Sequence, residues 1–229
     1  TYEKHWAFVA PVKAPLPEVS NSKWVKNEID PSILEKMEAK GFSPNETASK
    51  EVLIKRAFVD ITGLAPSYAQ LEQWRNNNND NWYSQLLDNL LQKPAYGEKM
   101  ALLWMDLARY ADSYGFQDDN IRSQWPWRDW VINAFNSNMH YDQFLTQQIA
   151  GDLLPNANKS TILTTAFFRN HKYTEEGGVI DEEYRVSYNI DKTRTYGKAI
   201  LGVTIECAQC HDHKYDPFSN KDYYQLYAF

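Results

Sequence analysis

Apolar residues recur at intervals of three and four along most of this chain, which is the spacing of one face of an α-helix. The alternation of apolar and polar residues that is typical of strands is nearly absent. The pattern therefore predicts an all-α fold, an irregular multi-helix domain with long loops. The expected helices cover residues 30–41, 49–61, 67–74, 80–91, 96–111, 126–137, 141–154, 159–169, 181–206 and 220–229.

Start signals support several of these helix boundaries. Asp30 is expected to cap the first helix, with Pro31 at its first helical position and Gly41 ending it. Ser67 and Asp80 are expected to cap two later helices, because short polar side chains can accept hydrogen bonds from the free amides of a first turn.

The two ends of the chain and one long helical segment need separate predictions. Residues 7–20 contain three prolines and predict an extended arm, so we expect an arm over residues 1–22 and a helical domain over 23–229. The apolar pattern still continues at Phe229, which favours a further C-terminal domain in the natural protein. Gly197 and Gly202 interrupt the 181–206 segment, and since glycine costs about 1 kcal/mol in a helix interior we expect a break there.

The chain has two cysteines, and both belong to the motif Cys207-Ala208-Gln209-Cys210-His211. The spacing C-x-x-C-H is typical of covalent haem c attachment, with the histidine as the proximal ligand of the haem iron. A structural zinc site normally needs a second cysteine pair, and a thioredoxin-like motif needs no histidine at that position. A disulfide or a purely structural cysteine pair stays open as the alternative.

A ligand on the opposite face of the haem has to come from another segment. Met139 lies at a turn between helices and His171 begins a loop, so both are distal candidates, and an empty sixth position also stays open. His213 follows His211 too closely to reach the other face; it can ligate another metal, bond a propionate or fix the loop. The remaining candidates are Met37, Met100, Met105, His5 and His140.

Acidic side chains are concentrated between residues 175 and 183, shortly before the cysteine motif. Glu175 and Glu176 precede two glycines, and acid-rich loops of this kind can bind calcium through oxygen ligands. The spacing does not match an EF-hand, and the acids at 181–183 also suit a helix N-terminus. Calcium is therefore a second candidate cofactor. Four arginines are candidates for contacts to haem propionates or carbohydrate, or are surface charges: Arg109, Arg122, Arg128 and Arg169.

Charge and motif content narrow the function. The net charge of −6 and the lack of a basic tract argue against nucleic-acid binding. No apolar run approaches the ~20 residues of a transmembrane span. The hydrolase motifs G-x-S-x-G and H-E-x-x-H and a phosphate-binding loop are also missing, so a redox role is favoured over catalysis.

Several segments, in this order, carry a family resemblance: 104–112, 127–131, 141–144, 150–155, 175–178 and 207–217. Together they resemble the planctomycete-type cytochrome c domain, over about Trp6 to Phe229. The resemblance implies haem attachment at Cys207, Cys210 and His211, in an exported multi-domain protein of the periplasm or outer cell surface. Proteins of this family are often encoded near sulfatases and polysaccharide-degrading enzymes, and the family supplies no substrate, reaction or distal ligand.

Three functions remain open on this basis. The first is an electron-transfer module with one covalent haem c that serves a redox partner domain or protein. The second is a binding or structural module among surface glycan-utilisation proteins, with the two cysteines in a disulfide and the acidic loop binding calcium. The third is an oxidative enzyme that uses an open haem site.

Overall fold

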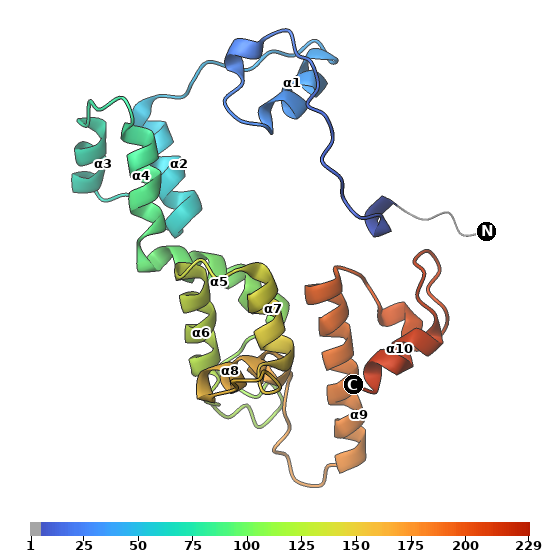
Figure 1. Ribbon diagram of the computed structural model, residues 1–229. Coiled ribbons are helices and arrows are strands. Elements are labelled where there is room, and N and C mark those ends of the chain that lie inside the picture. Colours follow the sequence, from blue (N-terminus) through green and yellow to red (C-terminus); the bar gives the residue numbers. More distant parts are fainter. Residues whose placement is uncertain (1–5) are drawn as a thin grey trace. The chain divides into compact units, whose positions relative to one another are not determined.

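The computed structural model describes residues 6–229, and the regular structure in this range is helical. It has ten α-helices, and an isolated bridge between Ser113 and Ile121 is the one β-type pairing among the residues described. The predicted all-α fold is confirmed. The chain divides into two compact units at the junction between Ser49 and Lys50, and each unit is described by itself (Figure 1).

The first unit contains the predicted arm and one α-helix, α1 (Asp30–Glu38). Short 3₁₀ turns, η1 and η2, cover Trp6–Phe8 and Ser22–Trp24, and residues 10–19 form no helix or strand. The Glu38 carboxylate accepts the amides of Ser20 (3.0 Å) and Asn21 (3.1 Å), which lowers its pKa and ties the end of the arm to α1. Residues 1–5 of the arm, and with them the candidate His5, lie outside the described range.

The prediction that Asp30 caps α1 is wrong. The cap position is Ile29, and Asp30 is the first helical residue. The Asn27 side chain accepts the amides of Ile29 (2.8 Å) and Asp30 (3.2 Å), while the Asp30 carboxylate accepts the amides of Lys26 and Asn27. The Asn27 side chain thus accepts the amide of the first helical residue, because a side chain three positions upstream also reaches a first turn, whereas the Asp30 carboxylate fastens the turn before α1.

The second unit begins with three helices around a small core. These are α2 (Lys50–Thr62), α3 (Tyr68–Arg75) and α4 (Trp82–Leu91). Ser67 caps α3 as predicted, in a reciprocal capping box with Gln70. Asp80 does not cap α4; its cap position is Asn81. The buried side chains of this core are Ile54, Ala57, Phe58, Trp74, Leu86 and Leu90.

A second core lies among α5 (Pro94–Ala108), α6 (Trp125–Asn136), α7 (Tyr141–Ala150), α8 (Lys159–Thr164) and the 3₁₀ turn η3 (Thr165–Arg169). Its centre is Trp104, which packs edge-on against Phe144 with ring centroids 5.0 Å apart and stacks on Phe167 at 5.6 Å. The Trp104 indole N–H donates to the buried Gln148 at 2.9 Å. α5 ends three residues earlier than the apolar pattern predicts, because Arg109 adopts a left-handed backbone conformation (φ 57°).

The last part of the unit contains the predicted long helix and its break. α9 (Asp181–Tyr196) continues into a π-helical turn, η4 (Gly197–Leu201), and stops at Gly202, whose φ is +66°. A Cβ on Gly197 would lie 2.6 Å from the Ile205 side chain, so the helix must end in glycine for the chain to fold back this closely. The expected break is therefore confirmed, and the helix does not reach residue 206.

After this break the chain forms the 3₁₀ turn η5 (Glu206–Gln209) and α10 (Asn220–Tyr227), which packs on α9 and on η5 (Figure 1). A third small core of Ile205, Ala208 and Tyr223 joins them. None of the helices found over residues 6–229 has the length and apolar character needed to cross a membrane.

Candidate functional site

Cys207, Cys210 and His211 lie on one turn of chain at η5. The amides of Cys210 and His211 both point to the carbonyl of Cys207, at 3.3 and 3.4 Å. Positions separated by three and four residues share one side of a helical turn. Both cysteines are free thiols, and all three side chains are exposed, whereas Ala208 between them is fully buried. The turn therefore presents two thiols and an imidazole to solvent from an anchored backbone.

The hydrogen bonding of His211 leaves one ring nitrogen available. Its Nδ1 lies 2.7 Å from the carbonyl oxygen of Asp212. Because a carbonyl can only accept, Nδ1 carries the proton of the neutral ring and Nε2 keeps its lone pair. Metal-bound histidines commonly donate their second ring N–H to a carbonyl or carboxylate, which fixes the tautomer and the ring orientation. In the neutral ring, Nε2 of His211 is thus available to a metal or another partner.

His213 has the opposite arrangement. Its Nδ1 accepts the backbone amides of Asp216 (2.8 Å) and Tyr215 (3.3 Å), so in the neutral ring Nε2 carries the proton. Its own amide donates to the carbonyl of Phe218 at 2.8 Å. Among the roles open to His213 in the sequence, the structure supports the fixing of the loop.

Side chains from α9 and α10 hold the backbone of the motif in place. The Asn220 side chain donates to the carbonyls of Ala208 (2.9 Å) and Gln209 (3.0 Å). The backbone N–H of Asn220 donates to the Asp212 carboxylate. Arg194 donates to the Gln209 side chain at 2.7 Å. Sequence reasoning missed Asn220 and Arg194, since nothing in their local pattern shows that they face the cysteine turn.

One ion pair lies directly beside the first cysteine. Lys198 of η4 contacts the carboxylate of Glu206. Burial raises the pKa of Glu206, but the hydrogen bond and the positive charge of Lys198 outweigh it, so the net shift is downward. The residue preceding Cys207 is therefore a paired carboxylate.

The two distal candidates lie in other surroundings. Met139 is partly buried against the core of α5–α8, and its amide donates to the carbonyl of Ala134 where α6 ends. His171 is buried, and its ring stacks on Tyr188 of α9 with centroids 4.4 Å apart. The structure brings together Cys207, Cys210 and His211, and it places Met139 in a different packing cluster.

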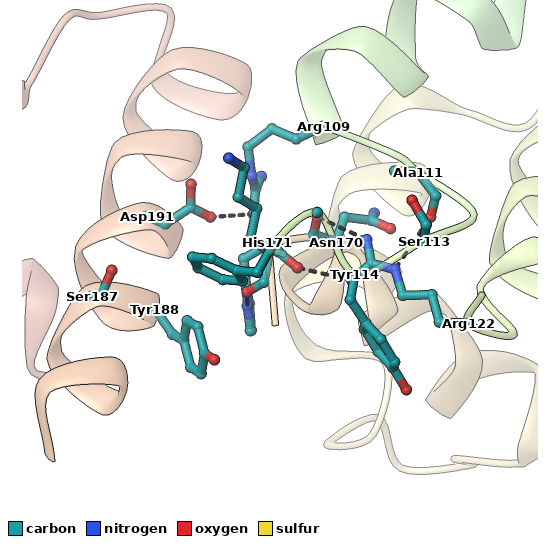
Figure 2. Close-up of a pocket in the computed structure, with 13 residues that line it drawn as sticks. Arg109, Ala111, Ser113, Tyr114, Arg122, Asn170, His171, Ser187, Tyr188 and Asp191 are labelled. Atoms are coloured by element: carbon teal, nitrogen blue, oxygen red, sulfur yellow. Dashed lines mark hydrogen bonds and ion pairs between the residues drawn. The ribbon is translucent and has the colours of Figure 1, made fainter. Parts of the chain in front are cut away.

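His171 lines a pocket between the segment after α5, the loop after η3, and α9 (Figure 2). Its Nδ1 lies 2.6 Å from the carbonyl of Lys172, so Nε2 again keeps its lone pair. Burial lowers the pKa of His171; the bond to Lys172 opposes this and the charge of Lys192 adds to it. His171 is thus neutral and capable of ligation.

The acidic residues proposed for calcium have other partners in the structure. The Glu176 carboxylate accepts the amide of Gln117 at 2.8 Å, and the Glu175 carboxylate accepts the side-chain amide of Asn120 at 3.2 Å. Both contacts fasten the 171–180 loop to the 112–124 loop. Over residues 6–229 no three His, Cys, Asp or Glu side chains are grouped closely enough to hold a metal ion.

The comparisons with known proteins give a family. A profile described as PSCyt2, protein of unknown function (DUF1549), matches residues 28–229. The chain belongs to the PSCyt2 family. The curated proteins contain no match to it, and the solved structures contain none either. The match covers most of this PSCyt2 chain, including α1 and the whole cysteine motif, and it assigns no activity.

The residues of the cysteine motif have the side-chain chemistry that a haem c group would need. Two exposed free thiols lie on one turn, and an imidazole with a free Nε2 follows them. Cys207 and Cys210 would hold the group through thioether bonds, and His211 would bind its iron from the proximal side. The framework of Asn220 and Arg194 would keep the turn in register with α9 and α10.

Proposed function

We propose that this PSCyt2 chain is a haem c-binding electron-transfer module of an exported or cell-surface protein. The observation that carries the proposal is the arrangement of the cysteine turn. Two free, exposed thiols are followed by a histidine whose Nδ1 donates to the Asp212 carbonyl, which leaves Nε2 free. When bound, haem c supplies a one-electron redox couple.

The chain's own residues perform the supporting work in this proposal. The Asp212 carbonyl orients the His211 ring and keeps its proton on Nδ1, which raises the basicity of the other nitrogen. Asn220 fixes the carbonyls of Ala208 and Gln209, so the turn keeps its shape. Because the turn lies at the surface, a partner domain or protein can approach it closely.

The test is the covalent attachment itself. The full chain should be produced in a bacterial host that has the haem c attachment machinery and an export signal fused to the chain. We expect the intact mass to rise by one haem, and a pyridine haemochrome spectrum typical of two thioether bonds. A variant with both cysteines replaced by serine, measured in the same way, should show no added mass.

The matched controls separate anchoring from iron ligation. Cys207→Ser and Cys210→Ser should each leave a single thioether at most, whereas His211→Ala should still allow the covalent mass but shift the absorption bands. An unmodified mass with a Cys207–Cys210 disulfide from the competent host would refute the haem proposal. It would favour the second function considered for this chain, a structural or binding module.

A further inference from the structure

Two cavities adjoin in the second unit, and neither is lined by a residue of the cysteine motif. One has a volume of about 320 Å³ and the other about 580 Å³. They share the lining side chains of Tyr114, Arg122, His171 and Tyr188, so they are neighbours, and we call the two together the arginine pocket; Figure 2 shows the lining of the smaller one. Its walls are the chain after α5, the loop after η3, and α9.

The charge of the arginine pocket is opposite to that of the whole chain. Five basic side chains line it, and two carboxylates face them, although the chain as a whole carries a net charge of −6. The basic residues are Arg109, Arg122, Arg169, Lys172 and Lys192, and the acidic ones are Asp191 and Glu175. A recess that concentrates positive charge in an acidic protein favours an anionic ligand.

Arg109 has hydrogen-bond donors that the protein does not use. It ends α5 in a left-handed conformation, and its side chain reaches across to Asp191 of α9, where Nη2 and Oδ2 lie 2.7 Å apart. Nη2 is held by this ion pair alone, and the Nε and Nη1 atoms are buried without a hydrogen-bond partner. Burial lowers the pKa of Arg109, and Asp191 only partly offsets this. Buried donors are rarely left unpaired in folded proteins. The unpaired nitrogens of Arg109 therefore indicate an acceptor that the protein itself does not supply.

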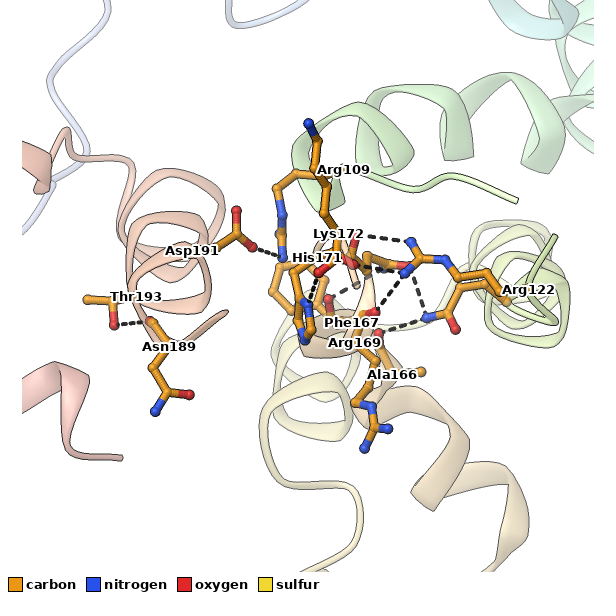
Figure 3. A network of polar contacts seen from close by, with 12 residues as sticks. Arg109, Arg122, Ala166, Phe167, Arg169, His171, Lys172, Asn189, Asp191 and Thr193 are labelled. Carbon is orange, nitrogen blue, oxygen red and sulfur yellow. Dashed lines mark hydrogen bonds and ion pairs between the residues drawn. The ribbon is translucent and has the colours of Figure 1, made fainter. Parts of the chain in front are cut away.

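Arg122 makes the wall of the pocket rigid. Its guanidinium donates to the carbonyls of Ala111 (3.2 Å), Asn170 (3.1 Å) and His171 (2.8 Å), as Figure 3 shows for the η3 side. These acceptors are neutral, so they fix the position of the positive charge without cancelling it. The loop after η3 is thereby clamped to the chain after α5.

Rings and hydroxyl groups complete the lining. Tyr114 lies against Tyr173 with centroids 5.5 Å apart, and Tyr188 lies against both His171 and Tyr173. Ser113 and Ser187 add hydroxyl groups to the smaller cavity. Flat aromatic faces beside hydroxyl groups suit a compact hydroxylated ring better than a bare inorganic ion.

We propose that the arginine pocket binds a hydroxylated organic carboxylate of the size of one sugar ring, a sugar acid. The ligand's carboxylate displaces Asp191 and takes the Nε and Nη2 donors of Arg109, the two that share one edge of the guanidinium. Its ring packs beside Tyr114 and Tyr188. Asp191 competes with the ligand for the same guanidinium.

The probes are glucuronate, glucose and acetate, measured by calorimetry and ligand-observed NMR on the full chain. Glucose keeps the ring without the charge, and acetate keeps the charge without the ring. We expect glucuronate to bind at least about tenfold more tightly than either, since a charge-assisted bidentate pair and ring packing each contribute. Equal binding of glucuronate and glucose, equal binding of glucuronate and acetate, or no glucuronate binding at millimolar concentration would overturn the proposal.

Two substitutions give effects of opposite sign. Arg109→Gln should weaken glucuronate binding by about tenfold or more, because the paired donors are lost. Asp191→Asn should strengthen it, because the internal competitor loses its charge. Arg75→Gln, in the exposed Arg75–Glu72 pair of α3, is the matched control and should change nothing. If Arg109→Gln does not fold, Asp191→Asn and the selectivity of the natural chain still decide the matter: weaker or unchanged binding in Asp191→Asn contradicts the proposal.

Discussion

The hydrogen bond that each histidine makes through Nδ1 determines which ring nitrogen keeps a free lone pair. His211 and His171 use Nδ1 to donate to a neighbouring carbonyl, which leaves Nε2 free. His213 uses Nδ1 to accept two backbone amides, which leaves no free lone pair on the neutral ring. Two histidines in the same short loop therefore have different hydrogen-bonding arrangements, although the sequence shows only their spacing.

We expect His213→Ala and His211→Ala to fail in different measurements. His213→Ala removes the acceptor for the amides of Tyr215 and Asp216, so the free energy of unfolding should fall by about 1–2 kcal/mol. His211→Ala removes an exposed side chain and should change stability little, but in haem-loaded protein it should shift the Soret band. Denaturant unfolding and absorption spectra measure the two effects.

His213→Asn is the control for this pair, because the Asn side-chain oxygen can occupy the place of Nδ1 and accept the same amides. It should recover most of the stability lost in His213→Ala. A spectral change in His213→Ala as large as that in His211→Ala would contradict the assignment of His213 to the loop.

His171 should make the stability depend on pH. Burial lowers its pKa in the folded state below the usual 6.5, so the unfolded chain binds a proton that the folded chain does not. Stability therefore rises with pH where the unfolded chain binds more protons. We expect stability to fall as the pH drops below about 6.5 and to level off below the folded-state pKa. The slope of unfolding free energy against pH measures this.

His171→Gln should reduce this slope, whereas His140→Gln, at an exposed position before α7, serves as the matched control. Identical slopes in the natural chain and in His171→Gln would show that His171 titrates alike in both states. The comparison should be made without haem, so that no ligation competes with protonation.

At the level of elements, the sequence predicts helices well because each helix carries its own apolar spacing. The break after α9 is also predictable, since Gly197 and Gly202 are visible in the sequence. Helix ends are less predictable: α5 ends at Ala108, since Arg109, a residue that ordinarily favours helix continuation, adopts a left-handed conformation there. The pairing of Arg109 with Asp191 joins distant segments, and no local pattern indicates it.

Gly197→Ala should show how closely the chain folds back after α9. Its new Cβ would lie 2.6 Å from the Ile205 side chain, so we expect a loss of about 1–3 kcal/mol in unfolding free energy. In an Ile205→Ala background the same substitution should cost clearly less, because the clashing methyl group is gone. Additive losses measured by denaturant unfolding would show that the contact is not the cause.

At the scale of the whole molecule, the family match and the compact units have different boundaries. The PSCyt2 match begins at residue 28 and includes α1, whereas the compact units divide between Ser49 and Lys50. A family profile follows residues that recur together in sequence, while a compact unit follows packing within one structure. The cysteine turn and the arginine pocket both belong to the second unit, so both proposed activities should depend on residues 50–229 alone.

This leads to a prediction about where the chain can be cut. Residues 42–49 form no helix or strand, and Glu46 among them is exposed, so a glutamate-specific protease should cleave after Glu46 before it cleaves within the helices. Glu98, inside α5, is the comparison site and should be cut much later. The large fragment should keep the helical circular dichroism and the glucuronate affinity of the full chain, because α2–α10 retain their three cores. Early cleavage within α5, or a large fragment that unfolds once released, would mean that the second unit depends on the first for its stability.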